Sequence, residues 1–320
     1  MKLMSARNNL PVTDRSSRWV RERIKSVWSH RMFYLFLLPG LAWFFIFSYI
    51  PLYGVTLAFK EYSFTKGILG SPWVGLKYFE QFFHYYQASD LIKNTVVISL
   101  LKLLIGFPAP IILALMLNEV SKSWFKRPIQ TISYIPHFIS WVVVYTLLNR
   151  LLSPSGGPVN DMIESFGGEK IFFFGEIDWF YPLIIVSFVW KDVGWNSIIY
   201  LAAISGIDQQ LYDAAKIDGA GRFKQMWHIT LPGIRDVFIL LFILGTGSLM
   251  SAGYEQLLLF NNPATASIGN VLDTYVINAG IKGGEMSYAT AIGFFQSVIA
   301  LIFILTANKI AKKVSSTHLF

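Results

Sequence analysis

A polar interval of the sequence runs from Tyr212 to Pro232 and reads YDAAKIDGAGRFKQMWHITLP, with a long apolar run on each side. Asp208 precedes it with a side chain suited to cap the first free N–H groups of a helix. The pattern predicts a helix over 209–217, with small residues on one face. Gly219 is predicted to end this helix, because glycine takes a left-handed conformation without strain. A second short helix is expected to follow and to stop at Pro232.

The composition is that of an integral membrane protein. Of the 320 residues, 54% are apolar and only 14% are charged, whereas a soluble domain carries about 25% charged residues. The chain has no cysteine, which excludes disulfides, zinc–cysteine sites and thiol nucleophiles.

Eight Lys or Arg lie in a basic tail, residues 1–32. The apolar run after it is longer than the roughly 7–15 residues of a secretory signal, so we expect an uncleaved first span and a transmembrane domain over 33–320.

Six segments are long and apolar enough to cross a bilayer as helices, which takes about 20 residues. The sequence therefore predicts an all-α integral membrane protein with six transmembrane helices and a short polar helix between spans four and five. The predicted spans are 33–59, 91–118, 129–152, 180–204, 237–260 and 288–307.

The distribution of lysine and arginine predicts the orientation of these spans. With a cytoplasmic N-terminus, 18 of the 27 lysines and arginines fall on the cytoplasmic side, which is a strong positive-inside bias. Both termini and the 208–235 loop are then cytoplasmic. The net charge of +8 is thus a topology signal, and nucleic acid is not an expected partner.

The polar interval resembles the cytoplasmic coupling loop of permease subunits of ATP-binding-cassette importers. The matching residues are Asp213-Ala214-Ala215, Asp218-Gly219-Ala220, Ile229 and Leu231-Pro232, with Asp213 where the family usually has Glu. The resemblance implies a permease subunit of the inner cell membrane that contacts a separate ATPase. The residues implied in this contact are Tyr212, Asp213, Ala214, Ala215, Asp218, Gly219 and Ala220.

The same resemblance implies partners and a substrate class. A permease of this kind pairs with a second permease subunit, two ATPase subunits and a periplasmic or extracellular substrate-binding protein. The chain is similar to the maltose-type sugar permeases, and in particular to permeases for large acidic oligosaccharides such as aldouronates and alginate. The subunit is then not itself an enzyme, it has no catalytic residue, and no cofactor or metal ion is expected.

Polar side chains inside the predicted spans are candidates for the substrate path, because each costs free energy in lipid. In the fourth span, Lys191 shares a helix face with Trp195, and Asp192 shares one with Asn196. In sugar permeases the residues before the coupling loop line the cavity, and the charges here favour an acidic sugar. A structural Lys191–Asp192 ion pair is the alternative. The predicted path is Trp190, Lys191, Asp192, Trp195 and Asn196, with a polar stripe of the fifth span: Ser248, Ser251, Tyr254 and Glu255.

Two other classes of protein were considered. An ion-coupled secondary transporter would use Lys102, Lys191, Asp192 and Glu255 as a relay, and the coupling motif would then have no role. A membrane-bound hydrolase is disfavoured because the sequence lacks paired exposed catalytic groups. The segment 70–77 fails as a phosphate-binding loop, because its lysine does not directly follow the second glycine. ATP is therefore expected to be hydrolysed by another chain.

Overall fold

The computed structural model describes Lys25 and residues 28–314, and these residues are almost entirely helical. No named strand occurs among them; the one β-type pairing is an isolated bridge between Lys60 and Trp73. Most of the basic tail predicted over 1–32 lies outside the described residues. The chain divides into two compact units, one ending at Thr56 and the other beginning at Leu57.

From Arg31 onward, the described residues of the first unit form one continuous helical segment. α2 (Arg31–Phe44) passes into a π-helical turn, η1 (Phe45–Tyr49), then α3 (Ile50–Leu52) and the start of the 3-10 segment η2 (Tyr53–Phe59). Taken together, Arg31–Phe59 is long and apolar enough to cross a membrane. The helix predicted over 33–59 is therefore confirmed as an apolar helical segment.

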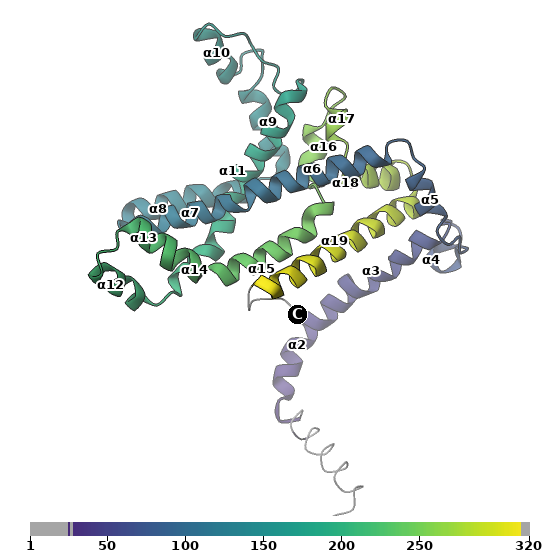
Figure 1. The fold of residues 1–320 in the computed structure, drawn as a ribbon. Coiled ribbons are helices and arrows are strands. Elements are labelled where there is room, and N and C mark those ends of the chain that lie inside the picture. The colour runs from purple at the N-terminus through teal and green to yellow at the C-terminus, as the bar shows by residue number, and fades with distance from the viewer. Residues whose placement is uncertain (1–24, 26–27, 315–320) are drawn as a thin grey trace, which may run out of the picture. The chain divides into compact units, whose positions relative to one another are not determined.

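The second unit contains the remaining helices (Figure 1). In chain order they are α4 (Gly67–Gly70), α5 (Lys77–Phe83), α6 (Ala88–Gly106), α7 (Pro108–Glu119), α8 (Ser123–Tyr134), η3 (Ile135–Phe138), α9 (Trp141–Leu151), α10 (Pro158–Ser165), α11 (Ile177–Ser205), α12 (Gln209–Ile217), α13 (Arg222–Gln225), η4 (Met226–Thr230), α14 (Leu231–Gly233), α15 (Arg235–Thr246), η5 (Gly247–Met250), α16 (Tyr254–Phe260), α17 (Ala266–Gly269), α18 (Leu272–Ile277), η6 (Asn278–Lys282) and α19 (Met286–Val314).

Three described helical segments have the length and apolar character of a membrane span: Arg31–Phe59, Ala88–Glu119 and Met286–Lys313. Two bent pairs bring the number to as many as five if each pair is one span. α11 covers the predicted fourth span; its 29 residues make a helix about 44 Å long. The count of six spans therefore stays a prediction.

Two predicted spans are not straight helices. The third is bent by 105° between α8 with η3 and α9, because Ile139 and Ser140 are extended. The fifth, predicted as one helix over 237–260, ends at Met250 and resumes at Tyr254. The helical run that begins at Arg222 continues through Pro232 and ends at Gly233, one residue beyond the expected stop, and it is bent by 58° from the helix that follows.

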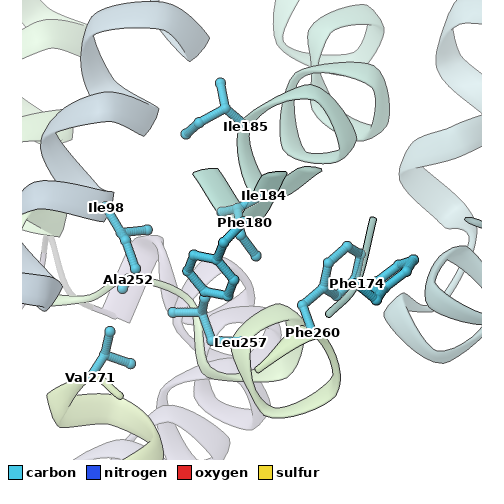
Figure 2. Packing of buried hydrophobic residues seen from close by; sticks show 9 residues of the cluster. All are labelled: Ile98, Phe174, Phe180, Ile184, Ile185, Ala252, Leu257, Phe260 and Val271. Atoms are coloured by element: carbon cyan, nitrogen blue, oxygen red, sulfur yellow. The ribbon is translucent and has the colours of Figure 1, made fainter. Parts of the chain in front are cut away.

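The largest buried cluster lies where α6, α11 and α16 meet (Figure 2). Phe180 and Ile184 of α11 and Leu257 of α16 are almost fully buried there. Polar side chains also cross between these helices: the Gln256 amide donates to the Ile184 carbonyl oxygen at 2.8 Å and to the Ser187 hydroxyl at 2.9 Å. Such bonds hold α16 against α11 after the break in the fifth span. The cluster comprises Ile98, Phe174, Phe180, Ile184, Ile185, Ala252, Leu257, Phe260 and Val271.

Candidate functional site: a coupling helix and a polar cavity

The helix predicted over 209–217 is confirmed with the same bounds, as α12. Asp208 caps its start, and the carboxylate accepts a hydrogen bond from the Gln210 N–H at 2.9 Å. Gly219 follows its end with φ +77°. The Gly219 N–H donates to the Lys216 oxygen at 3.0 Å, and the Ala220 N–H donates to the Ala215 oxygen at 2.8 Å. These two bonds form a Schellman C-cap, so local sequence fixes both ends of α12.

α12 exposes both charged and apolar side chains. Asp213 forms an exposed ion pair with Lys216 at 3.0 Å, and Ala214 is exposed beside it while Ala215 is half-buried. Ile217, the last residue of α12, is 88% exposed, and Phe223 of α13 is 81% exposed. Both apolar side chains are therefore available for contact with another protein.

Three contacts attach α12 and the following turn to the rest of the second unit. The Tyr212 hydroxyl lies 2.9 Å from that of Thr230, and the Gln225 amide donates to the Ala220 oxygen at 2.7 Å. Arg222 lies 3.8 Å from Glu119 at the end of α7. α12 is therefore held at the end of the unit where α7 stops and α8 begins (Figure 1).

A cavity of about 380 Å³, with both polar and apolar side chains in its lining, lies between α6, α11 and the break in the fifth span. Three residues of the predicted path line it: Asn196, Ser248 and Ser251. Lys102 of α6 lines it as well, although sequence reasoning had placed Lys102 only in the alternative ion relay. The cavity lining is completed by Ser99, Leu103, Gly106, Phe107, Phe188, Gly245, Ala252 and Gly253.

Lys102 reaches from α6 to the break in the fifth span. Its ammonium donates to the Ala252 carbonyl oxygen at 2.6 Å and lies 4.9 Å from the ring centre of Phe188. An ammonium has three N–H donors. Within the described part of the chain, the bond to Ala252 is the one hydrogen bond that Lys102 makes.

Asp273, just inside α18, stabilises the same break from another side. One carboxylate oxygen accepts from the N–H groups of Ala252 at 2.6 Å and Gly253 at 3.1 Å, and from the Ser251 hydroxyl at 3.3 Å. The other oxygen accepts from the Gln296 amide at 3.2 Å. Irregular backbone at membrane depth is tolerated where protein groups satisfy it or it lines a cavity, and here both conditions hold.

Sequence reasoning missed Asp273 because it fell in a predicted outer loop. It also treated the fifth span as a single helix, so Ser248, Ser251 and Glu255 were expected to form one stripe. The break overturns that stripe, since Ser251 is extended and Gly253 has φ +87°. The available signal was Gly253 inside an apolar run, which marks a possible interruption of a helix.

Lys191 is buried in the structure and contacts the bend in the third span. Its ammonium donates to the carbonyl oxygens of His137 and Ile139, each at 2.6 Å, and to that of Pro136 at 3.3 Å. It also lies 5.6 Å from the ring centre of Trp141. All three donors are therefore used by backbone at the bend, and in this conformation Lys191 stabilises the turn and does not line the cavity.

The alternative of a Lys191–Asp192 ion pair is also wrong. Asp192 instead contacts His137, with its carboxylate 2.8 Å from the imidazole Nδ1. The His137 ring lies parallel to the Trp195 ring, with centroids 4.8 Å apart. Trp195 therefore contacts the bend, although it is 41% exposed; Trp190 on the same helix is 42% exposed.

Tyr254 and Glu255 lie at the start of α16, beyond the break. Both are exposed, and the Tyr254 hydroxyl donates to the Glu255 carboxylate at 3.2 Å. Neither is among the residues that line the cavity. The nine residues of the predicted path thus separate into a cavity group, a group at the bend of the third span, and exposed residues.

The family model that describes the inner membrane component of binding-protein-dependent transport systems matches residues 106–316. The match covers more than half of the chain, including α12 and the helices on both sides of it. The chain belongs to this family. The resemblance to permease subunits of ATP-binding-cassette importers is therefore confirmed.

Two relatives from Bacillus subtilis match most of the chain. The chain is 49% identical over 280 residues to the polygalacturonan/rhamnogalacturonan transport system permease protein YteP of Bacillus subtilis (strain 168), covering 88% of this chain and 87% of YteP. It is 47% identical over 287 residues to protein LplB of the same organism, covering 90% of each chain.

One solved structure is similar to the present chain over nearly the whole length of both. A chain of a bacterial ABC transporter involved in the import of the acidic polysaccharide alginate has a TM-score of 0.84 and 39% sequence identity. The superposition covers 92% of this chain and all of that one. The same transporter was also solved in complex with an alginate pentasaccharide-bound periplasmic protein, with a TM-score of 0.83.

Proposed function

We propose that the chain is the translocation subunit of an ATP-driven importer of acidic oligosaccharides, and that it carries substrate but hydrolyses no ATP. The observation that carries this function is α12, a helix capped at both ends that presents exposed residues between two apolar stretches. Relatives that serve polygalacturonan and alginate support an acidic sugar as the substrate. Uptake by the reconstituted complex, driven by ATP, tests this function.

α12 is proposed to be the coupling helix that contacts a separate ATPase. Its contact set is Tyr212, Asp213, Ala214, Ala215, Asp218, Gly219 and Ala220. Through Arg222–Glu119 and Tyr212–Thr230, movement of α12 is transmitted to α7 and to the helix that leads into the fifth span. Closure of the ATPases on binding ATP would then turn the spans around the cavity and expose it to alternate sides of the membrane.

The partners proposed are a second permease subunit, two ATPase subunits and an external substrate-binding protein. α12 accounts for the ATPase contact. The binding protein is supported by the solved alginate transporter, whose complex contains a periplasmic protein. The second permease subunit is proposed from the resemblance to importer permeases alone.

The proposed topology has six spans with both termini in the cytoplasm. Contacts between loops support it. The predicted inner loops meet through Glu119 and Arg222. The predicted outer loops meet through the Tyr62 N–H, which donates to the Ser287 hydroxyl at 3.0 Å, and through the Asn262 amide, which donates to the Phe174 oxygen at 2.6 Å.

Cysteine labelling tests this topology, because the natural chain has no cysteine. In intact cells, Ser155→Cys is expected to react with an impermeant maleimide, since it lies in a predicted outer loop and is exposed. Ser123→Cys, equally exposed at the start of α8, is expected to react only after the membrane is permeabilised. The opposite pattern at the two sites would overturn both the topology and the cytoplasmic position of α12.

An ion-coupled secondary transporter is less well supported by the side-chain contacts. A proton relay needs ionisable groups joined by hydrogen bonds. Lys191 bonds to backbone carbonyls, Asp192 contacts His137, and Glu255 accepts from Tyr254. In the described residues these groups therefore form separate contacts and no connected path.

A further inference from the structure

We propose that Lys102 selects the charge of the substrate, and that its ammonium binds a carboxylate of a uronic-acid oligosaccharide in the cavity. This inference rests on the proposed function and names the residue that would distinguish an acidic sugar from a neutral one. It differs from the prediction drawn from sequence, which gave this role to Lys191.

The two lysines near the middle of predicted spans, Lys102 and Lys191, differ in how their donors are used. Lys191 donates to three backbone carbonyls and is 8% exposed. Lys102 donates to one carbonyl, that of Ala252, and lines the cavity. Two of its three N–H donors therefore remain for a ligand, as far as the described residues are concerned.

Lys102 also has no anionic partner within ion-pair distance among the described residues, whose five ion pairs do not include it. Asp273 acts on Lys102 through space but lies beyond ion-pair distance, and its carboxylate already accepts from two backbone N–H groups and two side chains. A cation at membrane depth is costly without a counter-charge. A substrate carboxylate supplies that charge through a charge-assisted hydrogen bond.

Ser99 gives a second, independent indication of a polar ligand in the same place. It precedes Lys102 by one turn of α6 and so shares its face, and it lines the same cavity. Ser99 is 5% exposed, and its hydroxyl has no hydrogen-bond partner among the described residues. Buried polar groups are nearly always paired, so a sugar hydroxyl beside the carboxylate would satisfy it.

The neighbouring residues suit a sugar ring that carries a carboxylate. Asn196 of α11 and Ser248 and Ser251 of the fifth span add neutral hydrogen-bonding groups around the cavity. Phe188 adds an aromatic face next to the ammonium. The site thus combines one cation with several neutral polar groups, which fits one carboxylate together with the hydroxyls of a sugar.

The test uses the full complex with its binding protein in lipid nanodiscs and measures ATPase stimulation. The probes are trigalacturonate and the neutral trisaccharide galactotriose. Lys102→Gln keeps an N–H donor for the Ala252 oxygen but removes the charge, and Lys102→Arg keeps the charge. We expect Lys102→Gln to raise the trigalacturonate concentration for half-maximal stimulation about tenfold to hundredfold, and Lys102→Arg to raise it much less.

Ser99→Ala is the matched control on the same face of α6. It removes a neutral hydrogen bond, so a shift of about tenfold or less is expected. The shift in Ser99→Ala reflects the loss of a hydrogen bond to a sugar hydroxyl, and it does not depend on the charge of the sugar. A larger loss in Lys102→Gln than in Ser99→Ala, reversed by Lys102→Arg, supports charge selection by Lys102.

Several outcomes would overturn this inference. One is unchanged trigalacturonate stimulation in Lys102→Gln; another is equal loss of assembled complex in Lys102→Gln and Lys102→Arg, which would make the lysine structural. Stimulation of the unsubstituted complex by galactotriose but not by trigalacturonate also overturns charge selection by Lys102. The complex would then still be an importer of oligosaccharides. A parent complex stimulated by neither sugar would count against the proposed function itself.

Discussion

Replacing Lys191 with methionine is expected to destabilise the protein by roughly 3 kcal/mol or more. The change removes a cation that donates to the carbonyl oxygens of Pro136, His137 and Ile139. These carbonyls belong to the bend between α8 and α9. Each buried acceptor left without a donor costs about 1–3 kcal/mol, and methionine supplies none. The measurement is the temperature at which half of the purified complex loses its monodisperse elution peak in detergent.

Lys102→Met is the matched control for Lys191→Met, because it removes a second, half-buried lysine of the predicted spans that donates to one carbonyl. Its expected loss of stability is smaller. The double variant Lys191→Met/Asp192→Asn is expected to be no more stable than Lys191→Met alone, because Asp192 contacts His137 and not Lys191. Full recovery in the double variant would show that the two residues form an ion pair and that the bend does not depend on Lys191.

Gly219→Val is expected to lower substrate-stimulated ATPase activity tenfold or more. Gly219 has φ +77°, which a β-branched residue adopts only with a strain of about 1–3 kcal/mol. No side chain or backbone atom lies within 4 Å of the position of a Cβ there. The effect would therefore come from the backbone of the C-cap and not from a clash. Stimulated ATPase activity of the co-purified complex is the measurement.

Gly219→Asn is the control for Gly219→Val. Asparagine tolerates the left-handed conformation better than other non-glycine residues, so most of the stimulated activity should remain. Full coupling in the valine variant, with normal ATPase association, would contradict a role for the end of α12 in transmitting the movement.

α12 could be predicted from sequence because its determinants are local. Its N-cap at Asp208 and its C-cap at Gly219 depend on residues within two or three positions of the helix ends. The family resemblance rested on the same stretch and was confirmed. Where capping residues mark both ends of a helix, sequence rules predict the correct bounds of that helix.

The bends in the third and fifth spans could not be predicted, because distant residues stabilise them. The carbonyls at the first bend are satisfied by Lys191, more than fifty positions away. The second break is satisfied by Lys102 on one side and Asp273 on the other. Apolar periodicity describes only the segment itself, so it favoured two continuous helices.

The same reason explains why the sequence could not show which polar residues of the spans line the cavity. The fourth span has two adjacent charges, and sequence spacing indicates only that they face different sides of a helix. Which of those sides faces a cavity and which faces a neighbouring turn depends on packing. In the structure Lys191 faces the turn, while Lys102, on another helix, faces the cavity.

The central claim is that this permease carries an acidic oligosaccharide at the expense of ATP hydrolysed by partner subunits. The most direct test is uptake of radiolabelled trigalacturonate into proteoliposomes that contain the complete complex, with the binding protein and substrate on one side and ATP on the other. We expect uptake that requires ATP and the ATPase subunits and that stops when Gly219 is replaced by valine. Uptake by the permease chains alone, driven by an ion gradient without ATP, would contradict the account.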